Sequence, residues 1–172
     1  GQPAGASSSD TVEYVTINTL GNVADFGNLT QGRWTLAALS SNTRGVFAGG
    51  ASPSTENIID YITISTVGNA TDFGDLTVAR KNALSSSNST TRGVFAGGYG
   101  GSPAAISNVI DYITIATTGD ATDFGDLTTA KQNIHTSVAS NTTKGLFAGG
   151  ATPSNLNSID QITIASTANA TD

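Results

Sequence analysis

Apolar and polar residues alternate along short stretches of the chain. The clearest stretch is 58–64, in which Ile59, Tyr61 and Thr63 alternate with the residues between them. This period of two is typical of a β-strand, and β-branched residues favour that state. Gly, Asn, Ser and Pro separate the apolar stretches, and no long stretch has helical spacing. The pattern predicts an all-β fold of short strands.

The strands belong to a repeat, because three strings recur about every fifty residues. Their copies lie at the following positions: Gly-Val/Leu-Phe-Ala-Gly-Gly at 45–50, 93–98 and 145–150; Asp-Tyr-Ile-Thr-Ile or a close relative at 13–17, 60–64, 111–115 and 160–164; Thr-Asp-Phe-Gly-Asp-Leu-Thr or a close relative at 24–30, 71–77 and 122–128.

Each unit is predicted to hold four strands, a to d. Strand a follows a basic residue, strand b is the Val-Phe-Ala stretch, strand c contains Asp-Tyr-Ile-Thr-Ile, and strand d follows an Asp-Phe-Gly-Asp turn. Because 169–172 repeat 69–72, we expect the chain to be a fragment of a longer array. The predicted divisions are a flexible lead-in at 1–9 and an array at 10–172, made of a part-unit 10–32, units 33–79 and 80–130, and a truncated unit 131–172.

Four-stranded units of this length are typical of propeller blades, and the arrangement resembles the kelch and galactose-oxidase-like repeat. In that family a basic residue opens strand a, Gly-Gly closes strand b, an aromatic residue lies in strand c and a Trp lies near strand d. Arg80, 97–98, Tyr112 and Phe124 occupy these places, with Phe instead of Trp. The resemblance implies tandem four-stranded antiparallel kelch-like β-propeller blades, as a fragment or partial ring.

Three longer strings, at 91–98, 108–115 and 121–127, resemble repeat proteins of marine bacteriophages, cyanophages among them. Such proteins are usually taken to be virion structural proteins, tail fibres or capsid-surface fibres. The resemblance implies a virion location, with other virion proteins or copies of the same chain as partners. It also implies loops that attach to a host-surface glycan or protein. A secreted or cell-surface bacterial adhesin or lectin-like module is the alternative.

Charge and composition narrow the possible partners. The net charge of −6 speaks against nucleic acid, which requires clustered Lys and Arg. No apolar run reaches the roughly 18 residues of a membrane helix. The absence of cysteine excludes disulfides and thiolate metal sites. We therefore expect no nucleic-acid partner, no membrane insertion and no cofactor.

Most charged residues recur at equivalent repeat positions, which indicates a structural role because a catalytic residue is needed once. We expect hydrogen bonds between units and within turns, and we expect Arg80 and its copies to pair with an Asp of the Asp-Phe-Gly-Asp turn. The recurrent basic residues are Arg33, Arg80 and Lys131 before strand a, and Arg44, Arg92 and Lys144 before strand b. The recurrent acids include Asp72 with Asp123, Asp75 with Asp126, and Glu13 with Asp60, Asp111 and Asp160.

Two chemical alternatives remain open. The Asp-Phe-Gly-Asp string could bind Ca²⁺, although calcium takes six to eight oxygens and two carboxylates supply few. His135, the single histidine, could act as a general base if a nucleophile and an orienting group lay beside it. A hydrogen-bonded strand residue is the simpler interpretation of His135, so we expect a non-enzymatic protein.

Residues that break the repeat are the candidates for binding. The segment between strands b and c varies in length, and insertions between units map to loops that often bind partners. Tyr99 offers rigid amphipathic surface. Trp34, the single Trp, could stack on a sugar or cover the end of the array. The loop candidates are Trp34, Glu56, Asn57, Tyr99, Asn108 and Asn155.

Overall fold

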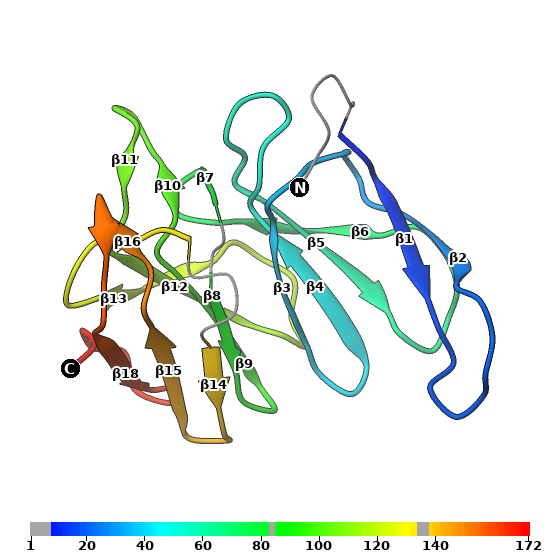
Figure 1. Ribbon diagram of the computed structural model, residues 1–172. Coiled ribbons are helices and arrows are strands. Elements are labelled where there is room, and N and C mark those ends of the chain that lie inside the picture. Colours follow the sequence, from blue (N-terminus) through cyan, green and yellow to red (C-terminus); the bar gives the residue numbers. More distant parts are fainter. Residues whose placement is uncertain (1–7, 83–84, 134–137) are drawn as a thin grey trace.

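The computed structural model describes residues 8–82, 85–133 and 138–172, and these ranges form antiparallel β-sheets without a helix (Figure 1). The prediction of an all-β fold is confirmed. The first sheet pairs β1 (Thr11–Tyr14) with β2 (Ala24–Asn28), the strands at positions c and d of the part-unit. Ahead of it, residues 1–7 of the expected lead-in lie outside the described ranges, whereas the Ser9 carbonyl accepts the Arg33 N–H at 3.1 Å.

The two complete units have the same four-stranded order, a-b-c-d. In the first, it runs β3 (Ala37–Ser40), β4 (Arg44–Ala48), β5 (Ile58–Thr63) and β6 (Thr71–Asp75). In the second, it runs β8 (Ser85–Asn88), β9 (Arg92–Ala96), β12 (Val109–Thr114) and β13 (Thr122–Asp126).

The last unit contains strands a, b and c. These are β14 (Val138–Ser140), β15 (Lys144–Ala148) and β18 (Ile159–Thr163), and Gln161 forms an isolated bridge with Thr171 where strand d would begin. Two small sheets of two-residue strands complete the fold. One consists of β7 (Arg80–Lys81), β10 (Tyr99–Gly100) and β11 (Ala105–Ile106). The other pairs β16 (Ala151–Thr152) with β17 (Ser154–Asn155).

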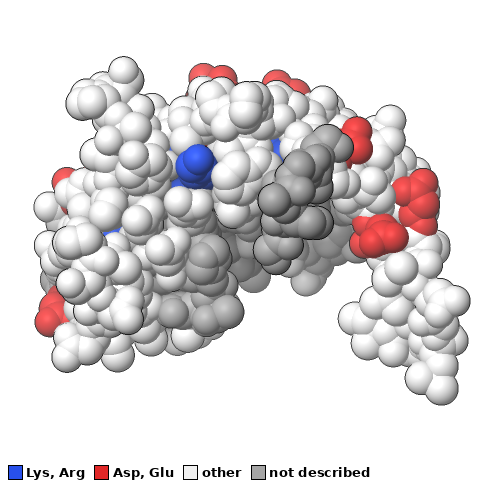
Figure 2. All heavy atoms as spheres, turned by 45° about the horizontal axis from the view of Figure 1, so that its top comes forward, with Lys and Arg blue, Asp and Glu red and all other residues white. Residues whose placement is uncertain are grey.

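Consecutive sheets stack face to face, so the middle sheet is covered on both sides. One apolar cluster lies between the two complete units and contains Phe95, while the other lies between the last two units and contains Val94. These two neighbours in β9 point to opposite faces and are both 0% exposed. The strands at position a, β3, β8 and β14, lie beside one another, and the units follow an arched outline (Figure 2).

The Asp-Phe-Gly-Asp string forms strand d itself, so the prediction of a turn there is wrong. In β6 the pairing runs from Gly74 opposite Ile59 to Asp72 opposite Asp60, which leaves Phe73 as the extra residue of a β-bulge. Phe73 is buried and packs edge-on against Tyr61 at 5.9 Å between ring centroids. Phe26 with Tyr14 and Phe124 with Tyr112 repeat this arrangement.

The glycine of each bulge allows neighbouring units to approach closely. A Cβ on Gly74 would lie 2.5 Å from the Gly119 backbone of the next unit, and the φ of Gly74 is +140°. Beside it, the Gly119 N–H donates to the Phe73 carbonyl and the Ala121 N–H donates to the Asp75 carbonyl, each at 2.7 Å. Glycine is required here by both the backbone conformation and the contact between units.

We predict that Gly74→Ala lowers the free energy of unfolding by about 2–4 kcal/mol, because the methyl group strains the backbone and pushes the next unit away. Urea denaturation followed by circular dichroism measures the change. Gly68→Ala is the matched control: a Cβ there meets nothing within 4 Å, so a change well under 1 kcal/mol is expected. Equal losses in the two variants would contradict the assigned contact.

Candidate functional site

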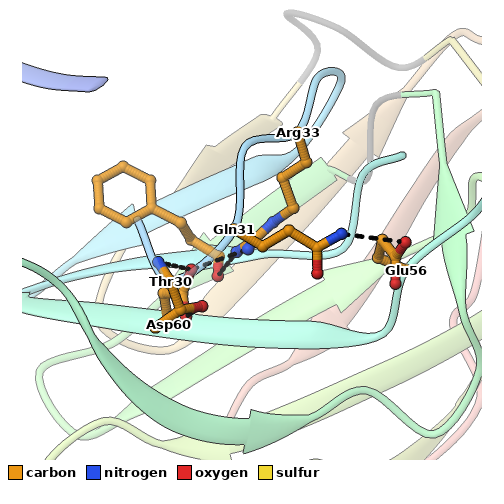
Figure 3. Close-up of polar contacts among 6 residues, drawn as sticks. Thr30, Gln31, Arg33, Glu56 and Asp60 are labelled. Atoms are coloured by element: carbon orange, nitrogen blue, oxygen red, sulfur yellow. Dashed lines mark hydrogen bonds and ion pairs between the residues drawn. The ribbon is translucent and has the colours of Figure 1, made fainter. Parts of the chain in front are cut away.

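Each complete or nearly complete unit contains a buried ion pair between the residue ahead of strand a and the acid of strand c. Arg33 Nη1 lies 2.8 Å from Asp60 Oδ2, and both side chains are fully buried (Figure 3). Arg80 with Asp111 at 2.8 Å and Lys131 with Asp160 at 2.7 Å are the copies. The predicted pairing of Arg80 with an Asp of the Asp-Phe-Gly-Asp string is therefore wrong.

The reason is the direction of the side chains. Asp72 and Asp75 on β6 are exposed, whereas Asp111 lies on the central strand β12, close to Arg80. The preceding unit contributes a different residue to the buried acid, the threonine that follows Asp-Phe-Gly-Asp-Leu. Thr77 donates from its hydroxyl to Asp111 Oδ1 at 2.5 Å, and the Thr30 hydroxyl donates to Asp60 Oδ1 at 2.5 Å (Figure 3).

The acid is thus bonded by a cation of its own unit and a hydroxyl of the unit before. Thr128 and Asp160 form the third copy of this contact. The sequence carries a signal for it, since the acid is the single charged residue of strand c in every unit. A buried carboxylate requires a cation and hydrogen-bond donors to offset its lost hydration.

The Arg80 guanidinium remains incompletely bonded. Its Nη2 donates to Asp111 Oδ2 at 2.8 Å and to the Phe95 carbonyl at 3.4 Å, while Nε and Nη1 are buried without a hydrogen-bond partner among the described atoms. Burial lowers the pKa of Arg80, and the Asp111 carboxylate opposes that shift. Arginine nevertheless remains charged at neutral pH.

The second set of basic residues joins neighbouring units. Arg44 Nη1 donates to the Ile115 carbonyl of the following unit at 2.8 Å, and Arg92 Nη1 donates to the Ile164 carbonyl at 2.9 Å. Each guanidinium also lies over the strand c tyrosine of its own unit, with Arg44 Cζ 4.3 Å from the centroid of Tyr61. Lys144, the third copy, is exposed and donates to Gln161 Oε1 at 3.1 Å.

The predicted binding loops gather at one end of the sheets, the upper end in Figure 1. Lys81 Nζ lies 4.9 Å from the centroid of the Trp34 ring, and Lys81 pairs with Tyr99 in the β7–β10 ladder. Trp34, Lys81 and Tyr99 therefore form a row across two units, and all three are half-buried. We call them the aromatic row.

The other loop candidates do not join that row into one site. The carbonyls of Asn57 and Asn108 accept the N–H groups of Leu76 and Leu127. The backbone of each Asn therefore bonds the residue that directly follows strand d. Glu56 accepts from Gln31 Nε2 at 3.4 Å, and its carbonyl accepts the Arg80 N–H (Figure 3). Asn155 is exposed on β17.

A polar hollow lies at the opposite end, where the turns between strands a and b of three units meet. It has a volume of about 540 Å³, and its described lining residues carry no charge. The position of this hollow was not predicted, because it depends on how three units converge. Its lining comprises Ser40, Ser41, Asn42, Thr43, Ser89, Thr90, Ile115, Ala116, Asn141 and Thr142.

The calcium alternative concerns side chains of the described ranges. No group of three or more His, Cys, Asp or Glu side chains in them is arranged to hold a metal ion. His135 lies outside the described residues. On the face in Figure 2 the acids are scattered and no basic patch forms. Within the same described ranges, no helix could cross a membrane.

At the boundary between the two complete units, the exposed Asp75 of strand d faces the acid Asp120 of the following unit. Burial, followed by the charges of Asp120 and Asp72, raises the pKa of Asp75. Asp120 is also held in place, because its Oδ1 accepts the Asp75 N–H at 3.0 Å. In the part-unit, Asn28 occupies the position of Asp75.

A scan of the sequence against models of protein families finds no match, and a search among curated proteins finds no similar sequence.

We predict that Arg80→Met lowers the free energy of unfolding by about 3–5 kcal/mol, because Asp111 is left buried without a cation. Adding Asp111→Leu should recover much of the loss, since the buried charge is then removed as well. Lys144→Met, which changes an exposed cation, should cost less than about 0.5 kcal/mol. Urea denaturation measures all three variants, and a similar small loss for Arg80→Met and Lys144→Met would refute a buried pair.

We also predict that Asp75→Asn stabilises the protein slightly at neutral pH. A carboxyl group whose pKa is raised on folding disfavours the folded state while it is ionised, and this effect disappears as the pH falls below the pKa of the unfolded chain. The gain in melting temperature should therefore be present at pH 7 and vanish in acid. Asp126→Asn, at the equivalent position of the next unit, provides the comparison.

Proposed function

We propose that the chain is a non-enzymatic virion structural protein, part of a tail or capsid fibre, whose units are kelch-like propeller blades that display loops for attachment to a host surface. The observation that carries this proposal is that the recurrent basic residues form contacts within and between the units. The basic residues at the two recurrent positions bond within a unit or to the next, so they form a scaffold and not a reactive site.

The arrangement of the sheets supports propeller blades. Both complete units are four-stranded antiparallel meanders, and consecutive units stack through their faces with the a strands side by side. Blades of four strands around a central axis have this organisation. The resemblance of the strings at 91–98, 108–115 and 121–127 to phage repeat proteins supports the virion role.

The loop end supports attachment, because there the units differ. The aromatic row places a Trp from one unit beside a Lys and a Tyr from the next. Half-buried aromatic rings provide flat surface for a glycan or protein at low entropic cost. Many copies on one particle would convert weak contacts into avidity.

Mass spectrometry of purified virions tests the structural role, and the expected result is the presence of peptides such as 145–150 in stoichiometric amount. Absence from particles, together with presence on the surface of a bacterial producer, would support a secreted or cell-surface adhesin instead.

For attachment, we predict that the double variant Trp34→Ser with Tyr99→Ser reduces binding of a multivalent display of the chain to host cells by about tenfold or more, because avidity multiplies the loss of each contact. Leu20→Ser is the control, since Leu20 is fully exposed and lies outside the aromatic row. Adsorption of fluorescent particles carrying each variant measures the effect. Equal binding by the double variant and the control would show that the aromatic row has no role.

A further inference from the structure

Strand β1 is paired along one edge within the described part of the chain. In the complete units, strand c lies between strands b and d, as β5 does between β4 and β6. β1 pairs with β2, and no described strand lies along its other edge. The N–H and C=O groups of such an edge are free to add a strand.

Glu13 in this strand is the counterpart of the buried acids, but no described cation pairs with it. Asp60, Asp111 and Asp160 are each fully buried and within 2.8 Å of a basic nitrogen. Glu13 is exposed. In the other units the cation comes from the segment just ahead of strand a, so Glu13 occupies a position that is complete only when an a–b hairpin is present.

The face of the next sheet is less covered at the same place, although Gly45 in it is buried. Phe95 is 0% exposed and packs in a cluster with Leu39 and Val46, from strands a and b of the preceding unit, whereas Phe47 is partly exposed. A Cβ on Gly93 would lie 2.5 Å from the Leu39 side chain. A Cβ on Gly45 would meet only Ile62 of its own sheet.

We propose that this edge of β1 binds a β-hairpin of the same repeat type: a basic residue, a short strand, a turn, and a second strand resembling Arg-Gly-Val-Phe-Ala. The second strand would pair with β1, the basic residue would bond Glu13, and the hairpin would cover the partly exposed Phe47 and pack beside Gly45. The expected register is that of β12 with β9, in which Asp111 pairs with Phe95 and Tyr112 pairs with Val94. Three separate features thus point to one occupant.

A second folded copy of the chain is a poor donor of that hairpin. Its b strands β4, β9 and β15 are each paired on both sides, so none has a free edge to offer. The occupant is therefore an unpaired a–b hairpin of the repeat. This inference rests on the geometry of the units and is independent of the attachment role.

The test is the binding of a synthetic peptide with the sequence of residues 80–98 to the whole chain, measured by isothermal titration calorimetry and hydrogen–deuterium exchange. We expect 1:1 binding and slower exchange of the β1 amides. Glu13→Gln in the chain, or Arg80→Gln in the peptide, should each weaken binding by about tenfold or more, because either leaves a buried charge unpaired. Combining them should add little. Asp123→Asn, an exposed acid in a complete sheet, should bind like the unmodified chain.

Three results would overturn the proposal. The first is no binding at millimolar peptide, and the second is binding that Glu13→Gln leaves unchanged. The third is dimerisation of the chain through β1 that excludes the peptide, which would make a second copy the occupant. Circular dichroism of Glu13→Gln verifies its fold, which should be unaffected because Glu13 is exposed.

Discussion

The structure depends on sheets burying their apolar faces against neighbouring sheets, which covers the middle sheet on both sides. A small sheet of short strands needs a covered apolar face, because a unit of this size buries little of its surface by itself. In β9, the adjacent side chains of Val94 and Phe95 are both fully buried because one faces the following unit and the other the preceding unit. Since each unit contributes equivalent apolar residues to such contacts, the same apolar strings recur along the chain.

Burial on both faces makes each polar group inside the stack costly, and the ion pairs are how the units accommodate them. Asp111 is enclosed between sheets, and it is bonded by Arg80 of its own unit and Thr77 of the preceding one. Replacing such a pair with apolar residues can be neutral, whereas breaking it is not. The ion pair therefore offsets the burial of Asp111 within its unit, and the Thr77 hydroxyl on the same carboxylate joins that unit to the preceding one.

Stacking also separates the scaffold from the surface that can bind partners. The strands and ion pairs are shared among units, while the aromatic row combines residues ahead of strand a, Trp34 and Lys81, with Tyr99 beyond strand b. At the first sheet, β1 has no described strand along its other edge, and Glu13 is exposed. The requirement of each sheet for a neighbour thus explains both the repeated buried contacts and the unpaired edge of β1 in the described part of the chain.

The sequence by itself determined the all-β class, the repeat and the approximate strands, because period-two alternation and recurring strings are local properties of the chain. It did not reveal that Phe73 is a bulged residue within strand d, since the bulge exists only relative to β5. Nor did it pair Arg80 correctly: Asp75 and Asp111 are both recurrent acids, and which of them is buried depends on the stacking of the sheets. Only the tertiary structure decided the ion pairs, the aromatic row and the polar hollow, because each joins residues that the folding of separate units brings together.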